Sequence, residues 1–153
     1  ALCLARELLT RERANTFHLG LDAYNYWYGT LTNPMHHDPY DDDWRAAERN
    51  DGNYWIFVSL VDARRCASLF CSHAAERFPD AADSLRKLAA RYEKMVETLE
   101  PLLERRIRPH REISRARPWT QRDRRIQAKT LRDVKEMEKA TLPLLEQASS
   151  ALE

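Results

Sequence analysis

The sequence contains little glycine, and this scarcity limits the folds that it can adopt. Only 3 glycines occur among 153 residues, too few for a sheet with many tight turns or for a glycine-rich phosphate loop. Long apolar runs are also missing, since the longest, at about residues 54–60, is far shorter than the ~20 residues of a membrane span. The N-terminal stretch becomes charged after a few residues, unlike a signal peptide. We therefore expect a cytoplasmic protein without a membrane segment.

Neither sign of charge dominates the chain. The 25 Lys and Arg residues against 24 Asp and Glu residues leave a net charge of +1, which predicts no general attraction to nucleic acid or to an anionic membrane. Cysteine is scarce and odd in number, with Cys3, Cys66 and Cys71 on apolar helical patterns. This usage favours reduced, buried thiols over a disulfide framework. No cofactor is indicated.

Residues 53–78 form the stretch around which the chain is organised. Residues 54–61 are apolar on almost every helical face, and the pattern then becomes one-sided. A helix that is apolar all round must be surrounded by other elements. The sequence thus predicts an all-α fold, a bundle of about five helices around an apolar central helix at 53–78, in a single domain over 1–153.

The remaining helices are read from their spacing, caps and prolines. We expect helices at residues 2–9 and 20–32, a short one at 44–49 capped by Asp43, and a turn at 50–52. A fourth helix follows Pro79 and ends or kinks near Leu99, and a fifth runs from about Pro118 with a kink at Pro143. The fourth carries an apolar seam at three-four spacing: Leu85, Leu88, Tyr92, Met95, Val96, Leu99 and Leu102.

Two groups of potential metal ligands can be tested by their spacing. Residues 34–43 hold a His pair and four aspartates, but adjacent His residues do not converge on one point and the EF-hand pattern is absent. Cys66, Cys71 and His73 lack both zinc-type spacing and a fourth ligand. No glutamate stands three residues before a histidine, as a di-iron bundle requires. We predict no metal site and assign no catalytic residue.

Aromatic residues crowd the second expected helix at Tyr24, Tyr26, Trp27 and Tyr28. Both faces of this helix therefore carry rings. One interpretation is core packing on one side and a loop or partner on the other. The second is an aromatic-lined pocket with hydroxyl groups directed at a ligand.

Charged residues interrupt the apolar central helix at Asp62, Arg64 and Arg65. An ion pair between Asp62 and Arg65, one turn apart, would account for two of them. The alternative is that these charges form the exposed rim of a binding cleft.

Arginines concentrate between residues 105 and 125, and we interpret 105–118 as a connection. Arginine suits phosphate recognition through its planar pair of donors. However, Trp119 is the only nearby aromatic, and no nucleic-acid-binding motif frames the run. A solvated segment paired with acidic residues is the simpler interpretation. The candidates for polyanion binding are Arg105, Arg106, Arg108 and Arg111.

Several short patterns resemble one bacterial family. They are Gly20-x-x-Ala23-Tyr24-x-x-Trp27-x-x-x-Leu31, then Asn53-Tyr54, Asp62-Ala63-Arg64-x-x-Ala67-x-x-Phe70, and Leu85-x-x-x-Ala89-x-x-Tyr92, with a late helix at Leu144, Leu145 and Glu146. Together they resemble the helical C-terminal half of predicted C39-like cysteine-peptidase proteins, related to the N-terminal domain of the butirosin-biosynthesis H protein. The resemblance implies that this chain is part of a longer protein. Its catalytic Cys and His would precede this segment.

The resulting prediction is an accessory or ligand-recognition domain beside a papain-like domain, without a complete catalytic site of its own. Whether the whole protein is an enzyme stays open. The expected partner is an upstream domain or a second copy, with a small-molecule or peptide ligand. The alternatives are a stand-alone bundle that binds a small aromatic or apolar ligand and an arginine-driven binder of polyanions or nucleic acid. The candidate ligand-binding residues are Tyr24, Trp27, Tyr28, Asn53, Trp55, Asp62 and Arg64.

Overall fold

The computed structural model describes residues 2–36, 43–105 and 119–152, and its elements are almost all helical. The predicted 105–118 connection lies almost wholly outside this range, as do Arg106, Arg108 and Arg111, and the side chain of Arg105 is not described. In chain order the elements are α1 (Leu2–Thr10), β1 (Arg13–Ala14), β2 (Phe17–His18), α2 (Gly20–Thr32), the 3-10 turn η1 (Pro34–His36), α3 (Asp43–Arg77), the 3-10 turn η2 (Pro79–Ala81), α4 (Ala82–Arg105), α6 (Gln121–Lys139) and α7 (Leu142–Ser150). The predicted all-α bundle is confirmed.

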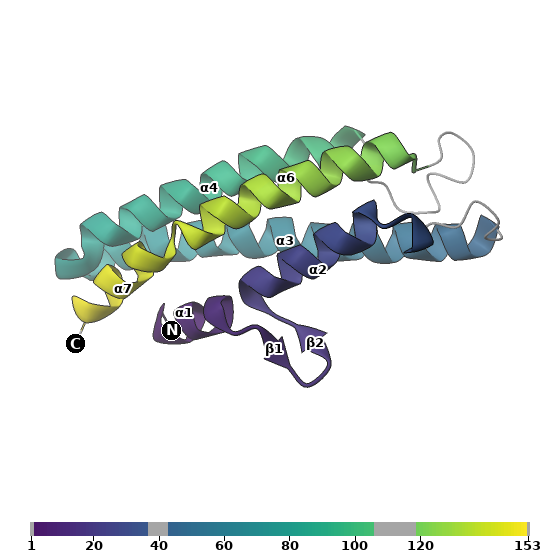
Figure 1. Cartoon of the computed structure of the whole chain (residues 1–153). Coiled ribbons are helices and arrows are strands. Elements are labelled where there is room, and N and C mark those ends of the chain that lie inside the picture. The colour runs from purple at the N-terminus through teal and green to yellow at the C-terminus, as the bar shows by residue number, and fades with distance from the viewer. Residues whose placement is uncertain (1, 37–42, 106–118, 153) are drawn as a thin grey trace.

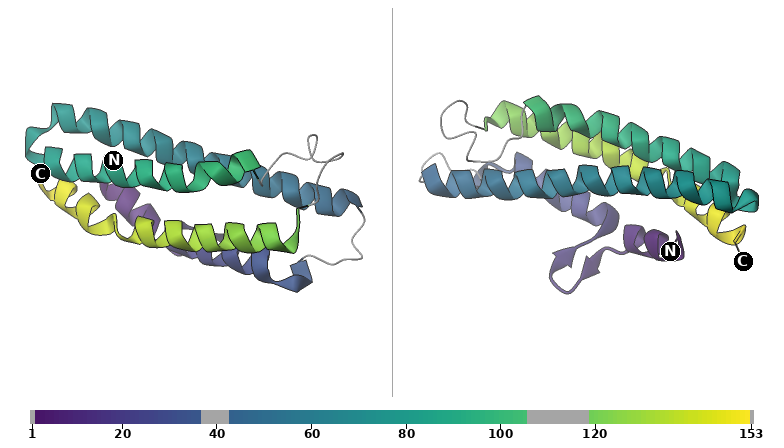
Figure 2. Two further views of the ribbon diagram at one scale, coloured as in Figure 1. Left: turned by 90° about the horizontal axis from the view of Figure 1, so that it is seen from above. Right: turned by 180° about the vertical axis from the view of Figure 1, so that it is seen from behind.

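The bundle is built on two extensive helix pairs. α3 and α4 form a long antiparallel hairpin through η2, while α2 lies along α6 (Figure 1). Figure 2, seen from above, shows that the axes of these four helices are roughly aligned, with α7 continuing the direction of α6. α1 packs against α7 and α2 beneath the bundle. No helix in the described part of the chain is long and apolar enough to cross a membrane.

The core confirms the apolar seam predicted in the fourth helix. All seven seam residues are buried, and Leu85, Leu88, Met95 and Leu99 have no exposed side-chain surface. They meet residues of the facing helices. Those partners include Phe57, Val61, Leu131, Val134 and Leu145.

α3 is longer than the sequence indicated. It is one helix from Asp43 to Arg77, so the predictions of a separate helix at 44–49 and a turn at 50–52 are wrong. Gly52 lowers helix stability by only about 1 kcal/mol. The hydrogen bonds that buried Asn53 makes with Trp27 and Gln127 outweigh that preference.

α3 is also less enclosed than predicted. Phe57 and Val61 face the core, but Trp55 and Ile56 are more than half exposed. The expectation that other elements surround residues 54–61 is therefore wrong, because the bundle covers one side of this helix.

Pro101 does not end its helix, and Pro143 lies just after the point where the predicted fifth helix divides. α4 continues through Pro101 to Arg105, so it does not stop near Leu99. The predicted fifth helix divides at Ala140–Thr141, and Pro143 occupies the first turn of α7, where a proline lacks only an amide that would be unpaired anyway.

The cysteines do not share one environment. Cys71 is buried, and burial raises the pKa of its thiol to about 11. Cys3 and Cys66 are exposed, so the prediction of buried thiols is wrong for these two. Cys3 of α1 lies beside α7, with its Sγ 2.8 Å from Ser149 Oγ.

Candidate functional site

A pocket of about 700 Å³ opens between the β1–β2 hairpin, α2 and the first half of α3. We call it the aromatic pocket. Its rings come from Phe17, His18, Tyr26, Trp27, His36 and Trp119, and Asn53, Gly52 and Ile56 border it from α3. The size and the largely apolar lining with a few polar groups are typical of small-molecule sites.

The hairpin wall of the pocket is held by an unusual backbone conformation. Asn15 and Gly20 both have positive φ, 54° and 50°, which reverses the chain between β1 and β2 and again at the start of α2. A Cβ at Gly20 would overlap the backbone carbonyl of Leu9. The close approach of α1 to the start of α2 therefore requires glycine.

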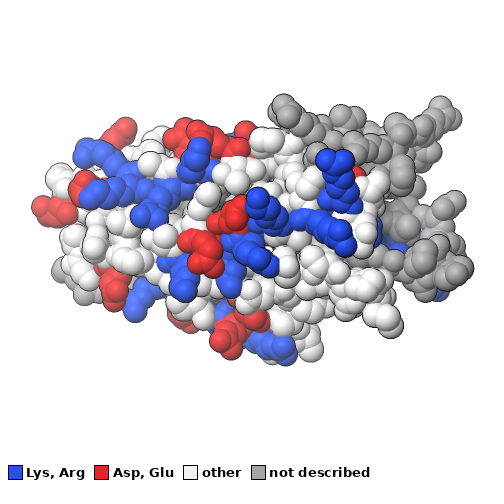
Figure 3. All heavy atoms as spheres, turned by 45° about the horizontal axis from the view of Figure 1, so that its top comes forward, with Lys and Arg blue, Asp and Glu red and all other residues white. Residues whose placement is uncertain are grey.

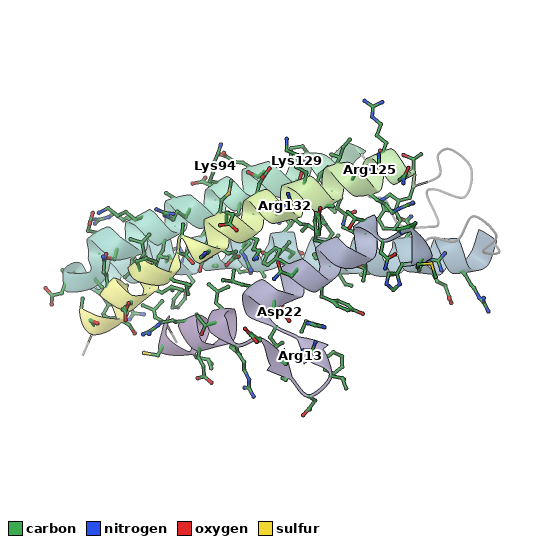
Figure 4. All side chains as sticks on the ribbon, in the orientation of Figure 1. Arg13, Asp22, Lys94, Arg125, Lys129 and Arg132 are labelled. Carbon is green, nitrogen blue, oxygen red and sulfur yellow. The ribbon has the colours of Figure 1, made fainter. Side chains whose placement is uncertain are left out.

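His18 connects the hairpin to α2. Its Nδ1 donates a hydrogen bond to Asp22 Oδ2, and its ring stacks on Tyr26 with centroids 4.3 Å apart. The hydrogen bond from His18, aided by the charge of Arg13, holds the pKa of the Asp22 carboxyl below its usual 3.8. Figure 4 shows Arg13 and Asp22 beside each other, from β1 and α2. These contacts orient two rings of the aromatic pocket.

The inner wall of the pocket is fixed by a buried amide network. Trp27 Nε1 donates to Asn53 Oδ1 at 3.0 Å, and Gln127 Nε2 donates to the same oxygen at 2.8 Å. Asn53 Nδ2 donates back to Gln127 Oε1 at 3.2 Å. The Trp27 ring packs edge-on against Phe57, with centroids 5.9 Å apart. Asn53 and Gln127 are 7% and 0% exposed, so this network sets the Trp27 ring before any ligand arrives.

A second buried polar cluster joins α2, α3 and α6. Arg64 Nε is ion-paired with Glu138 Oε1. The Tyr24 hydroxyl lies 3.5 Å from the same carboxylate and 3.4 Å from Arg64 Nη2. Glu138 is only 2% exposed. This burial raises its pKa, against the opposing charge of Arg64, and burial likewise raises the pKa of Tyr24.

The structure divides the seven predicted ligand-binding residues among different places. Trp27 and Asn53 come together in the aromatic pocket, whereas Tyr24 and Arg64 belong to the buried cluster with Glu138. Tyr28 is half-buried under Arg132, whose guanidinium lies 4.6 Å from the ring centroid. Figure 4 marks Arg132 on α6.

The other two predicted residues, Trp55 and Asp62, face solvent. Trp55 is 59% exposed and contacts the edge of Tyr54. Asp62 accepts a hydrogen bond from Arg65 at 2.7 Å, which confirms the predicted pair, and Arg65 also bridges to Glu100 of α4.

Gln127 and Glu138 were missed by sequence reasoning, although a signal for them exists. They fall four residues before Leu131 and four after Val134, on the buried stripe of α6. The apolar spacing of that helix therefore places both on the core face. Phe17, His18 and His36 gave no such signal, because short hairpins and turns have no apolar period to read.

On the face shown in Figure 3, the charges give little support to a polyanion site. On the face in Figure 3, Lys and Arg side chains are interspersed with Asp and Glu. Within the described ranges, no group of three or more His, Cys, Asp or Glu side chains is placed to hold a metal ion.

Comparison with known proteins gives no further guide to this site. No family model, no curated protein and no solved structure matches the chain.

Proposed function

We propose that this chain is a ligand-recognition helical domain that holds a flat, mostly apolar small molecule in the aromatic pocket. The supporting observation is the preset position of Trp27, whose indole is fixed by Asn53 and Gln127 at the pocket wall. A ring inserted beside Trp27, Tyr26 and Phe17 would gain stacking and edge contacts. Contact with Trp27 would not require ordering a mobile side chain, a cost that weakens binding at unformed sites.

Gly52 offers a test that separates binding from folding. It borders the pocket, and a Cβ added there meets no atom within 4 Å. Gly52→Leu should therefore be accepted in the helix and raise its stability by several tenths of a kcal/mol, while placing a side chain at the pocket. Gly29→Leu is the matched control, because Gly29 is also helical, has equally open surroundings and does not line the pocket.

The measurement is tryptophan fluorescence during titration with indole, naphthalene and their carboxylates. We expect saturable binding to the unaltered chain and to Gly29→Leu, with at least tenfold weaker binding to Gly52→Leu. Equal affinity of all three proteins for every bound probe would place the ligand elsewhere and contradict the proposal. Saturable binding to none of these probes would also contradict it.

The association with a papain-like domain rests on the residue patterns alone, and it stays a prediction together with the cytoplasmic location. The open reading frame of the native protein tests the association: an upstream segment that contains a Cys and a His would support it. The polyanion alternative stays a prediction too. It requires binding to duplex or single strand that weakens steeply with salt.

A further inference from the structure

We propose that α3 pairs with α3 of a second copy of this chain, in antiparallel orientation, through a two-fold axis that passes between Asp62 and Ala63. Figure 2, seen from behind, shows α3 as the foremost helix along the middle of the bundle. The side of α3 that faces away from the core is apolar over four turns except at Asp62, which lies on it near the midpoint. We call it the α3 outer face, and its residues are Trp55, Ile56, Ser59, Ala63, Cys66, Leu69 and Phe70, all exposed.

Large exposed side chains at both ends of this face need a partner. Trp55, Ile56, Leu69 and Phe70 are 59%, 56%, 56% and 50% exposed. A contiguous apolar strip of this kind is typical of an interaction surface. Between the two ends lie the small side chains of Ser59, Ala63 and Cys66, which allow two helices to approach closely.

The order of residues on the face is self-complementary. Trp55 and Ile56 precede the midpoint between Asp62 and Ala63 by as many residues as Phe70 and Leu69 follow it. Ser59 and Cys66 are related in the same way. A two-fold axis at that midpoint would therefore lay the large residues at one end of α3 over those at the other end of the second copy. Such isologous contact is what closed dimers require.

The charges beyond the apolar strip obey the same relation. Glu48 precedes Trp55 by seven residues and Arg77 follows Phe70 by seven, which is about two helical turns and keeps both on the outer face. Both are exposed. In the antiparallel dimer Glu48 of each copy faces Arg77 of the other, whereas a parallel dimer would set like charges against each other. This complementarity favours a second copy, in this orientation, as the occupant.

Arg65 offsets part of the negative charge near the axis. The two copies bring their Asp62 carboxylates close together on one flank of the interface. Each Asp62 is already paired with Arg65 at 2.7 Å, and Arg65 also reaches Glu100. Two Arg65 side chains, each shared with Glu100, therefore reduce the repulsion between the two Asp62 carboxylates.

Disulfide trapping tests the register. Ser59 of one copy would face Cys66 of the other, whereas within one chain these positions are about 10 Å apart along the helix, beyond the ~7 Å that a disulfide can join. We expect Ser59→Cys, in a Cys3→Ser background, to give a disulfide-linked dimer under mild oxidation. Adding Cys66→Ser should abolish it. A Cys66-dependent linked dimer in the Cys3→Ser background alone would indicate parallel pairing and overturn the proposal.

A charge exchange tests the orientation without cysteine chemistry. Glu48→Arg and Arg77→Glu, each alone, should raise the dimer dissociation constant about tenfold, because each creates two like-charged contacts per dimer. The double variant should restore it. Sedimentation equilibrium measures the dimer dissociation constant of the unaltered chain, of each single variant and of the double variant. A monomeric unaltered chain, or a dimer that yields no Ser59→Cys linkage and does not respond to the exchange, overturns the proposal.

Discussion

Arg64 of α3 and Glu138 of α6 form an ion pair inside the bundle, and Tyr24 of α2 approaches both. Three helices that are distant in sequence are therefore connected by one carboxylate that is 2% exposed. A buried pair of this kind contributes little net stability compared with apolar packing. Breaking it, however, leaves an isolated charge inside the protein.

Loss of the Glu138 carboxylate should strongly destabilise the bundle. Glu138→Ala leaves the Arg64 guanidinium without its buried partner, so we expect the free energy of unfolding to fall by about 3 kcal/mol. Urea denaturation followed by circular dichroism measures the change. The double variant Arg64→Met and Glu138→Leu should regain most of the loss. If the double variant loses as much unfolding free energy as Arg64→Met and Glu138→Leu lose separately when added together, the pair is not coupled.

The same carboxyl should make stability depend on pH. Because burial raises the pKa of Glu138 above its ordinary 4.5, the folded state holds this proton more tightly than the unfolded state. Stability from this group is then greatest below pH 4.5 and is lost as the pH rises toward the folded pKa. As the pH rises from 4.5 toward the folded pKa, the unaltered chain should therefore lose unfolding free energy relative to Glu138→Gln. Parallel pH profiles for the two proteins would contradict the raised pKa.

Removing Asn53 alone from the amide network should lower the free energy of unfolding more than removing Asn53 and Gln127 together. Asn53→Leu leaves the Trp27 and Gln127 donors without their shared acceptor, and we expect a loss of about 2–3 kcal/mol. In the double variant Asn53→Leu and Gln127→Leu only the Trp27 donor remains unpaired, so part of that loss should return. Denaturant midpoints of the unaltered chain, Asn53→Leu, Gln127→Leu and the double variant form the double-mutant cycle. A coupling energy near zero would mean that Asn53 and Gln127 do not act together.

The three glycines should respond differently to alanine. Gly20→Ala places a Cβ against the Leu9 carbonyl at a positive φ, so we expect a loss of more than about 1–2 kcal/mol. Gly29→Ala and Gly52→Ala lie in open helical surroundings and should each gain about 0.5–1 kcal/mol. Thermal melts compare them directly. A neutral Gly20→Ala would show that α1 does not pack closely on the start of α2.

Two of the three thiols should react in the folded protein. Cys3 and Cys66 are exposed, whereas Cys71 is buried with its pKa raised to about 11, which leaves little reactive thiolate at neutral pH. At protein concentrations low enough for the chain to be monomeric, labelling with an aromatic disulfide reagent should therefore show two fast equivalents and a third only after unfolding. Cys71→Ser should keep both fast equivalents. A single fast equivalent would show that Cys3 or Cys66 is covered.

The sequence predicts the helices better than it predicts where they are exposed. The α4 seam was found because its three-four spacing depends only on which face is buried. The exposure of Trp55 and Ile56 could not be found, because an apolar residue on the outer side of α3 has the same sequence pattern as one in the core. The start of α3 was missed because Asn50, Asp51 and Gly52 resemble a turn until the burial of Asn50 is known.

The candidate site was predictable only in part. Trp27 and Asn53 stood out through their residue types, and the structure brings them to one pocket. Gln127 and Glu138 could have been found from the apolar stripe of α6. The hairpin wall could not, since the closeness of Gly20 to the Leu9 carbonyl is a tertiary contact.

The most direct test of the aromatic pocket is NMR spectroscopy of the four tryptophan indole N–H groups during titration with a bound aromatic probe. Trp27 and Trp119 border the pocket, whereas Trp55 lies on the α3 outer face. We predict saturable shifts at Trp27 and Trp119, with Trp55 unchanged. Shifts confined to Trp55, or none at Trp27 while the probe binds, would contradict a ligand site in the aromatic pocket.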